Sequence, residues 1–401
     1  LSVRGGTDRA RYFILGSYYN QGGNYKHSNS DNVNKFLRYN FRAHVDVDAT
    51  KRLKISVDLG ARVTEYNYPG ATAANIISLA NTQPPYLPII LPNNHNDVNQ
   101  ADFEENGGYL LYADNDYRYN MLGQLNRTGF SKRTRRYLQG SFKLSHDLDF
   151  ITKGLSATGM ATFYNRVYSA VYRSFTPFLY KLTDYSIDDA GNYSYVSESA
   201  NTGTTYLGTS RGKDGYRELA FQVKLDYNRT FNEKHDVGAT LVYHQKERMM
   251  HIADSEEYAV LPYRQQGLAG RVTYGFDKRY LVEANFGYNG SENFAPGKRF
   301  GFFPSVAAGW VVSNEPFWRA IKDKVNLLKF RVSYGLVGND VISSEYADRF
   351  PYLTTVDMDQ GYDVYIGTNH IRKYGPILSV YGNPDATWEE SRKLDVGVEI
   401  G

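Results

Sequence analysis

The chain has 401 residues, 22% of them charged, and a formal net charge of only +3, so its charge gives no case for nucleic acid as a partner. Cysteine is absent, which excludes disulfides, thiolate chemistry and cysteine-ligated metals. The mean hydropathy of −0.53 and the lack of long apolar runs exclude transmembrane helices. A transmembrane β-barrel stays compatible, because its strands alternate apolar and polar residues.

Alternation marks the first strands within the first seventy residues. The stretch FRAHVDVDATKRLKISVDLGARV, residues 41–63, consists of two alternating runs joined by Lys51 and Arg52. Apolar side chains take one parity in each run and polar side chains take the other. Because successive side chains of a strand point to opposite faces, the stretch predicts a hairpin with one apolar and one polar face.

Alternating segments of this kind recur along the whole chain. Most have about 10–15 residues, which exceeds the roughly 5–6 of a typical soluble strand and suits the ~9–11 of a tilted membrane-crossing strand. The twelve predicted strands are 9–20, 36–50, 53–65, 136–147, 153–167, 217–230, 236–248, 267–276, 279–290, 301–313, 327–339 and 388–400.

The connections between these segments alternate in length. Short ones fall at 51–52, 148–152, 231–235 and 277–278, with a modest one at 314–326. Long ones fall between them, at 21–35, 66–135, 168–216, 249–266, 291–300 and 340–387. Outer-membrane barrels have short periplasmic turns and long extracellular loops. The fold class predicted is therefore all-β, an antiparallel transmembrane β-barrel fragment, with 66–135, 168–216 and 340–387 outside the cell.

Aromatic residues are abundant, with 36 Tyr, 21 Phe and 3 Trp. Many lie near predicted strand ends, where aromatic girdles would meet the two membrane interfaces. The alternative is the general preference of aromatics for strands. The residues concerned are Tyr18, Tyr19, Tyr66, Tyr68, Tyr164, Tyr168, Tyr274, Phe276, Tyr280 and Tyr288.

Two connections carry helical patterns. In 314–328, Trp318, Ile321, Val325 and Leu328 have helical spacing, and Asn314 is a candidate N-cap for a short helix on the periplasmic rim. The segment 71–92 begins helically and breaks at its prolines, which predicts a structured loop.

Catalytic signatures are scarce: the sequence contains no H-E-x-x-H, G-x-S-x-G or phosphate-binding glycine motif. We therefore expect no enzyme activity. Asp357, Asp359 and Asp363 resemble the front of a calcium loop, but Thr368 stands where a bidentate acid belongs, so a plain turn is the favoured alternative.

Aromatic residues among amides and carboxylates in the longest loop suit sugar rings or peptide backbones. The alternative is packing of loop on loop. The candidate substrate-binding residues are Tyr66, Tyr68, Tyr109, Tyr112, Tyr117 and Tyr119.

Three stretches resemble the barrel of one known family. They are FGYNGSENFAPGKRFGFFPSVAAGWVVSNEPFW (286–318), LLKFRVSYGLVGND (327–340) and YGNPDATWEESRKLDVGVEIG (381–401), and 3–23 and 36–63 look like earlier hairpins of the same family. The family is the SusC/RagA-type TonB-dependent outer-membrane transporters of Bacteroidetes. The resemblance runs over nearly the whole chain, with gaps at the long loops.

The resemblance implies a 22-stranded barrel occluded by an N-terminal plug. It also implies import of a glycan or oligopeptide, energy from the TonB-ExbB-ExbD complex, a SusD-like surface lipoprotein as a lid, and no cofactor. Residues 1–401 are then expected to be a partial barrel whose plug, TonB box and C-terminal strands lie outside this chain. Alternatives to an importer are a surface β-rich binding or adhesion module and an outer-membrane β-barrel enzyme.

Overall fold

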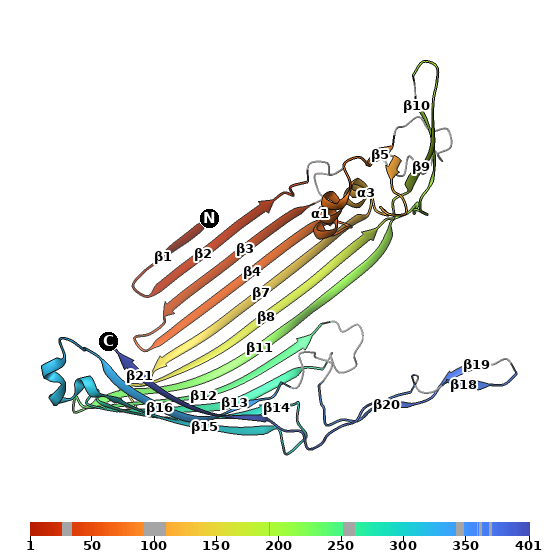
Figure 1. The fold of residues 1–401 in the computed structure, drawn as a ribbon. Helices are drawn as coiled ribbons and strands as arrows, with labels where there is room; N and C mark the ends of the chain where they lie inside the picture. The colour runs from red at the N-terminus through yellow and green to blue at the C-terminus, as the bar shows by residue number, and fades with distance from the viewer. Residues whose placement is uncertain are drawn as a thin grey trace.

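A computed structural model describes residues 1–25, 34–91, 110–191, 193–251, 261–341, 349–358, 360, 363–368 and 371–401. Strands dominate it, and none of the helices in these ranges is long and apolar enough to cross a membrane. The central feature is one curved antiparallel sheet, with most of the smaller elements at one of its ends (Figure 1).

This large sheet has 13 strands, and each pairs antiparallel with its neighbours. Their order in space follows their order in the sequence, as in an up-and-down barrel. The strands are β1 (Ser2–Gly6), β2 (Ala10–Gln21), β3 (Lys35–Asp48), β4 (Leu53–Pro69), β7 (Gly129–Asp147), β8 (Leu155–Ser174), β11 (Gly208–Phe231), β12 (His235–Met250), β13 (Tyr263–Phe276), β14 (Tyr280–Ser291), β15 (Phe300–Val311), β16 (Leu328–Asn339) and β21 (Glu389–Ile400).

All twelve predicted strands are present, and β1 adds a thirteenth that the alternation did not separate. The main differences lie at the long-loop end of three strands. There β7 begins seven residues before the predicted 136, β8 ends seven residues after the predicted 167, and β11 begins nine residues before the predicted 217. The loops 66–135 and 168–216 are correspondingly shorter than predicted.

Antiparallel neighbours place every second connection at the same end, and the alternation of short and long connections is confirmed for most of the sheet. The exception is 312–327, between β15 and β16, which is longer than 292–299, between β14 and β15 at the opposite end. At the long-loop end, α1 (Ala73–Thr82) and α3 (Met121–Asn126) lie beside a four-stranded sheet of order β10-β9-β6-β5 (Figure 1). Its strands are β5 (Ile90–Leu91), β6 (Leu110–Tyr112), β9 (Leu179–Ile187) and β10 (Tyr193–Ser199). Two two-stranded sheets pair β17 (Thr355–Asp357) with β20 (Ile377–Val380) and β18 (Asp363–Ile366) with β19 (Ile371–Tyr374).

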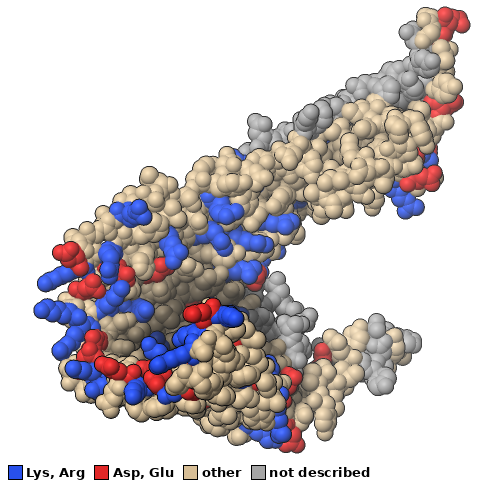
Figure 2. Space-filling model, turned by 60° about the vertical axis from the view of Figure 1, so that its left-hand side comes forward, with Lys and Arg blue, Asp and Glu red and all other residues tan. Residues whose placement is uncertain are grey.

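The register of the large sheet separates an apolar face from a polar face. One row of paired residues crosses nine strands and is free of polar groups apart from the tyrosine hydroxyls: Val47, Ile55, Leu144, Gly159, Val223, Tyr243, Leu268, Tyr288 and Phe302. Large apolar side chains of this parity stay exposed, including Val272 at 55% and Val306 at 57%. The opposite parity carries the charges that gather in the hollow of the sheet (Figure 2).

A belt of aromatic rings follows the short-turn edge of the apolar face. The register aligns one ring on each of six neighbouring strands: Phe231, His235, Phe276, Tyr280, Trp310 and Phe330. This is the arrangement of a girdle at a membrane interface. Of the aromatic residues assigned to girdles from the sequence, Tyr18, Tyr274, Phe276, Tyr280 and Tyr288 have the outward parity. Tyr19, Tyr66, Tyr68, Tyr164 and Tyr168 instead face the hollow, because they fall on the polar parity.

The two helical predictions have different outcomes. Helix α1 is confirmed, with the Thr72 hydroxyl accepting a 3.2 Å hydrogen bond from Asn75 N. In 314–328 the structure forms two short 3₁₀ helices, η1 (Val312–Asn314) and η2 (Pro316–Ile321). The predicted Asn314 cap is wrong, because Asn314 Nδ2 donates instead to the carbonyl of Lys278.

Candidate functional site

The polar face contains a hollow of about 530 Å³ near the short turns of β3, β4 and β7. Most of its charged residues are paired with one another, whereas Lys143, which also lines it, forms no ion pair with a described residue. The guanidinium of Arg42 lies 3.0 Å from Asp58, and Lys54 lies 3.5 Å from Asp46, which also accepts a hydrogen bond from Ser56. This part of the polar face therefore offers little uncompensated charge to a ligand.

The same face has a different composition near the long loops, on β4, β7, β8 and β11. Arginines and tyrosines alternate there across the strands, and we call this surface the arginine–tyrosine wall. Its members are Arg62, Tyr66, Tyr68, Arg133, Arg135, Tyr137, Tyr164, Arg166, Tyr168, Tyr172 and Tyr216. Tyr66 and Tyr68, two of the predicted substrate-binding residues, belong to it.

Two arginines of β7 are each held between tyrosines of the neighbouring strands. The guanidinium carbon of Arg133 lies 5.6 Å from the ring centre of Tyr68 and 5.4 Å from that of Tyr172. Arg135 lies 5.6 Å from Tyr66 and 5.5 Å from Tyr168 in the same way. Such cation–π contacts contribute about 0.5–2 kcal/mol each and fix the plane of the guanidinium.

The wall continues along its lower rows through further ring and cation contacts. Arg62 lies 4.1 Å from the ring centre of Tyr137. Tyr164 and Tyr216 stack at 5.5 Å, and Arg166 lies 5.9 Å from the ring of Tyr216. These contacts hold a continuous polar and aromatic surface in place.

Sequence reasoning missed the arginines of this wall. The stretch KRTRRY, residues 132–137, alternates Arg133 and Arg135 with Thr134, which places both guanidinium groups on one face of a strand. This alternation indicates a strand, but it lies within 66–135, which the sequence predicts to be a loop.

The other predicted substrate-binding residues lie in the loop region, apart from the wall. Tyr112 ends β6, and its hydroxyl donates a 2.6 Å hydrogen bond to Asp114. The backbone N–H of Tyr117 donates to the same carboxylate, and Tyr119 is 62% exposed. Tyr109 lies outside the described residues. The structure thus divides the predicted set into two wall residues and a loop group.

The Tyr112 hydroxyl is committed to holding the loop. Burial, together with the hydrogen bond to Asp114, raises the pKa of Tyr112 to about 12. Burial acts to raise the pKa of the Asp114 carboxyl, but hydrogen bonds from Tyr112, Tyr117 and Asp116 outweigh it and lower that pKa. Both groups therefore keep their hydrogen-bonded forms near neutral pH. Tyr119 is the loop tyrosine best placed to meet a ligand.

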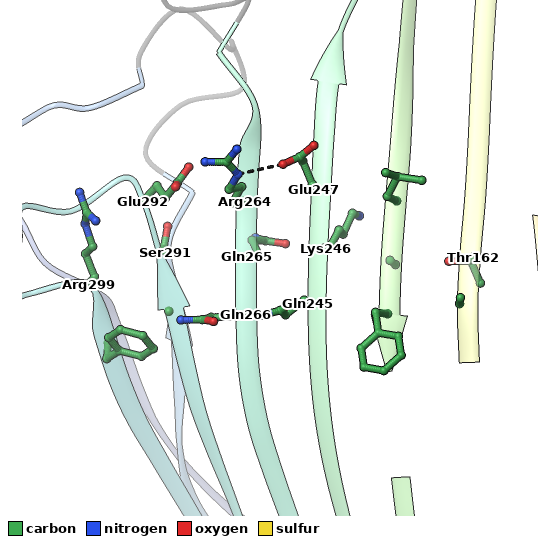
Figure 3. A pocket seen from close by; sticks show the side chains of 16 residues that line it. Thr162, Gln245, Lys246, Glu247, Arg264, Gln265, Gln266, Ser291, Glu292 and Arg299 are labelled. Carbon is green, nitrogen blue, oxygen red and sulfur yellow. Dashed lines mark hydrogen bonds and ion pairs between the residues drawn. The ribbon is translucent and has the colours of Figure 1, made fainter. Parts of the chain in front are cut away.

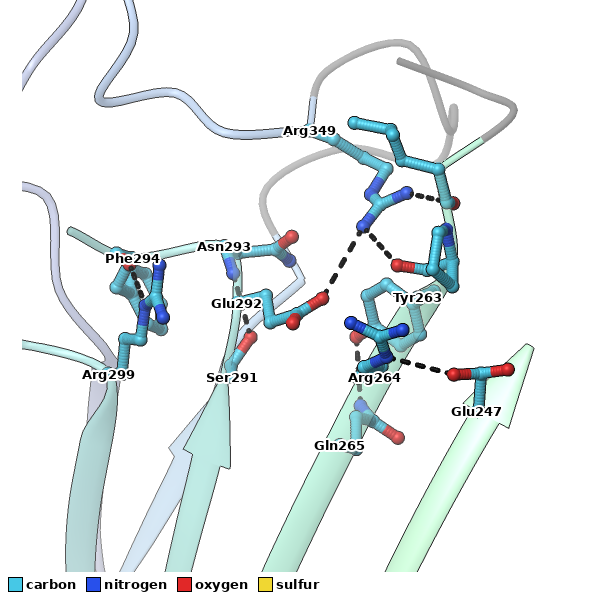
Figure 4. Close-up of polar contacts among 12 residues, drawn as sticks. Glu247, Tyr263, Arg264, Gln265, Ser291, Glu292, Asn293, Phe294, Arg299 and Arg349 are labelled. Carbon is cyan, nitrogen blue, oxygen red and sulfur yellow. Dashed lines mark hydrogen bonds and ion pairs between the residues drawn. The ribbon is translucent and has the colours of Figure 1, made fainter. Parts of the chain in front are cut away.

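A second polar cluster fastens the last long loop to the ends of β13 and β14 (Figure 4). Arg349 is only 8% exposed and donates to the carbonyls of Leu261, at 2.6 Å, and Pro262, at 3.0 Å. The Tyr263 hydroxyl donates to Asp340 at 3.1 Å. These contacts fix both flanks of the residues between 341 and 349.

A cavity of about 600 Å³ lies near this cluster (Figure 3). Phe221, Gln245, Gln266 and Phe300 line it and come from one row of the sheet register. That row has the outward parity, so we assign the cavity to the outer face and not to the face of the arginine–tyrosine wall.

Metal binding finds no support in the described residues, where no group of three histidines or carboxylates is arranged to hold an ion. The described residues do not test the weak calcium candidate. Asp357 ends β17, whereas Asp359 and the side chain of Asp363 lie outside what the structure describes.

Several curated proteins resemble this chain in sequence, although no protein-family model matches it. TonB-dependent receptor P3 of Formosa agariphila is 25% identical over the whole chain. The TonB-dependent receptor SusC of Bacteroides thetaiotaomicron is 27% identical over 138 residues, 33% of the chain. The chain spans 37% of the length of the first of these relatives and 12% of the second.

Solved structures show the same fold. The RagAB peptide importer in its open-open state matches the whole chain with a TM-score of 0.63 at 16% identity, and the chain covers 41% of that protein. A second structure, of the RagAB peptide transporter, matches with a TM-score of 0.60. The 13-stranded sheet therefore corresponds to part of a TonB-dependent barrel, and the resemblance of this chain to SusC/RagA-type TonB-dependent transporters is confirmed.

Proposed function

We propose that this chain is part of an importer that carries a large nutrient across the outer membrane of a Gram-negative, Bacteroidetes-like cell. One observation carries the proposal: thirteen consecutive antiparallel strands place apolar side chains outward and charged side chains in the hollow. Hydrocarbon satisfies no backbone hydrogen bonds, so a membrane-crossing sheet has to close into a barrel. The polar face then lines the passage.

The proposed importer contains more than the residues seen here. Residues 1–401 supply thirteen strands, and a barrel of 22 strands needs about nine more. We assign those strands, the N-terminal plug and the TonB box to other parts of the protein. The similar TonB-dependent receptor of Formosa agariphila, of which the chain spans 37%, supports this assignment.

The substrate class we propose is a glycan or oligopeptide, with a glycan favoured. A SusD-like lipoprotein covers the long-loop end, and the TonB-ExbB-ExbD complex supplies energy through the plug. The long connections on one edge, with their own small sheets and helices, give such a lid a broad surface. The protein acts by binding and gated passage and performs no covalent chemistry.

Uptake measurements test the proposal. Deletion of the gene should abolish uptake of the nutrient, and loss of TonB should have the same effect while leaving surface binding intact. Purification should require detergent, since the apolar face needs a substitute for lipid. Uptake that persists without TonB, or a protein that purifies as a monomer without detergent, would contradict it.

The loop tyrosines allow a sharper version of this test. Tyr119→Ala removes an exposed ring and should weaken substrate binding. Tyr112→Phe is the comparison, because it removes only the hydroxyl that holds Asp114. Unchanged affinity in the triple variant of Tyr109, Tyr112 and Tyr117 to Ala would remove this loop from the binding site.

A further inference from the structure

We infer that the nutrient is an anionic polysaccharide, whose carboxylate or sulfate groups bind the arginines of the arginine–tyrosine wall. This inference rests on the proposed import function and specifies its substrate class. Arg133 and Arg135 are its centre, and Arg62 extends the site toward the interior of the barrel.

The wall holds positive charge that the chain does not neutralise. Arg62, Arg133 and Arg135 form no ion pair with any residue that the structure describes. The Nε atoms of Arg133 and Arg135 are buried and lack a hydrogen-bond partner within the same residues. Partial burial of a cation without a counter-ion costs free energy. An anion that binds there therefore gains more free energy than it would by pairing with a cation in open solvent.

Several arginines elsewhere on the polar face have carboxylate partners. Near the short turns, Arg42 pairs with Asp58 at 3.0 Å and Arg271 pairs with Glu283 at 2.5 Å. Arg42 and Arg271 therefore have carboxylate partners, as does Arg166 of the wall, which lies 3.3 Å from Asp214. Arg62, Arg133 and Arg135 are the wall arginines that form no ion pair with a residue the structure describes.

The tyrosines prepare the arginines for an anion. Rings of Tyr68 and Tyr172 flank Arg133, and rings of Tyr66 and Tyr168 flank Arg135, so each guanidinium is oriented before a ligand arrives. Contacts through the ring faces leave guanidinium edges for bidentate hydrogen bonds to carboxylate or sulfate oxygens. Alternate residues of one strand lie about 7 Å apart, which presents two anion sites in series.

The wall stands at the entrance of the passage. On the outward parity of the same strand, its neighbours are Lys132, Thr134 and Arg136, none of which suits hydrocarbon. These rows therefore extend beyond the membrane on the long-loop side. A polymer that arrives from outside meets this charge first, and electrostatic attraction increases its local concentration.

The chemistry of the wall favours a polysaccharide over an acidic peptide. Inward positions on β4 from 62, on β7 up to 139 and on β8 from 164 are Arg, Tyr, Thr, Ser, Gln, Gly129 and a single aliphatic residue, Ala170. Peptide recognition uses apolar pockets for alternate side chains, and this surface offers none. Hydroxyl and amide groups beside guanidinium groups suit a ligand that is rich in hydroxyls and carries regular negative charge.

The test compares matched polymers on the complete transporter, purified in detergent with its lipoprotein partner. Dextran and dextran sulfate share one backbone and differ in charge, oligogalacturonate presents carboxylates, and poly-L-glutamate presents carboxylates on a peptide. We expect dextran sulfate, oligogalacturonate or both to bind at least tenfold more tightly than dextran, and this preference should weaken as salt rises. Which of the two binds better distinguishes sulfate from carboxylate.

Variants locate the site. Arg133→Gln with Arg135→Gln should weaken binding of the preferred anion roughly tenfold or more, because two charge-assisted contacts are lost. The matched control, Arg42→Gln with Arg271→Gln, removes the same charge from paired arginines of the same face and should leave affinity nearly unchanged. Arg133→Lys with Arg135→Lys keeps the charge and should restore only part of the affinity, since lysine lacks the planar fork.

Three results would overturn this inference: equal affinity for dextran and dextran sulfate, equal losses in the two double glutamine variants, or tighter binding of poly-L-glutamate than of either anionic glycan. None of these would refute import, which is judged by TonB-dependent uptake of whatever the protein binds. Conversely, selective anion binding without TonB-dependent uptake would refute the importer and leave the binding site.

Discussion

The indole Nε1 of Trp310 donates a 3.0 Å hydrogen bond to the carboxylate of Glu315, which joins the aromatic belt to the turn beneath it. The guanidinium of Arg279 lies 2.9 Å from the other oxygen of the same carboxylate. Hydrogen bonds from Tyr280, Trp310 and Arg279 lower the pKa of Glu315 below its ordinary value of about 4.5.

This carboxylate predicts a specific pH dependence of stability. Because the folded-state pKa is lowered, the contribution of Glu315 is complete above about pH 4.5 and is lost as pH falls through the folded pKa. Glu315→Gln should therefore lower the unfolding temperature at pH 7 and lose less stability than the parent below pH 4.5. The exposed Glu390→Gln serves as the control, and an identical pH profile for both variants would contradict the prediction.

Assignment of the two faces predicts unequal costs for one substitution at two neighbouring positions. Val57→Arg places a charge on the apolar face and should lower the free energy of unfolding by roughly 2–4 kcal/mol if the position lies near the bilayer midplane. Ser141→Arg places the same charge in the polar hollow, next to Asp58, and should cost much less. Denaturant titration in lipid vesicles measures both, and equal costs would refute the assignment of faces.

The hairpin turn between β13 and β14 carries backbone strain. Asp277 and Lys278 have φ angles of 50° and 53°, as in a two-residue turn that favours Asn-Gly. Lys278→Gly should raise the free energy of unfolding by up to about 1 kcal/mol, because relief of roughly 1–2 kcal/mol of left-handed strain exceeds the roughly 0.5–1 kcal/mol entropic cost of glycine. Lys322→Gly, at a right-handed helical position with φ −57°, should lower it instead. The same sign at both sites would contradict this explanation.

Arg349 predicts a local change in loop stability. Arg349→Gln removes charged hydrogen bonds to the Leu261 and Pro262 carbonyls, and the opening free energy of 349–358 should fall by about 1.5–3 kcal/mol. Hydrogen exchange of that segment should then accelerate roughly tenfold or more. Arg264→Gln is the control, because Arg264 pairs across to Glu247 on the adjacent strand. Unchanged exchange in the Arg349 variant would show that other contacts hold the loop.

The sequence predicted those parts of the fold in which one face meets hydrocarbon and the other meets water. Ile55 and Val57 alternate with Ser56 and Asp58 because each face of the strand has one environment. Beyond the membrane both faces are wet, so polar residues occupy both parities and the contrast between apolar and polar positions that marks the other strands is lost. For this reason the first residues of β7, including Arg133 and Arg135, were assigned to a loop.

The candidate site was predicted only in part for the same reason. Tyr66 and Tyr68 are predicted to bind substrate because they are aromatic. The arginines that contact them lie on another strand, more than sixty positions later in the chain. A short helix around Asn314 was predicted from spacing alone, whereas Pro316 starts a 3₁₀ turn and Asn314 bonds to the preceding hairpin. Contacts between segments that are distant in the sequence determine both the arginine–tyrosine pairs and the turn at Asn314. Local sequence patterns contain no information about such contacts.

Strand length differs widely within the sheet: β11 has 24 residues, whereas β14 has 12. At about 3.3 Å per residue, the difference of twelve residues corresponds to roughly 40 Å along the strand. The long-loop edge of the sheet is consequently uneven, with a high side that bears Arg133 and Arg135 and a low side around β14. In the proposed importer, a lid over this end has to follow an edge that slopes from β11 down to β14.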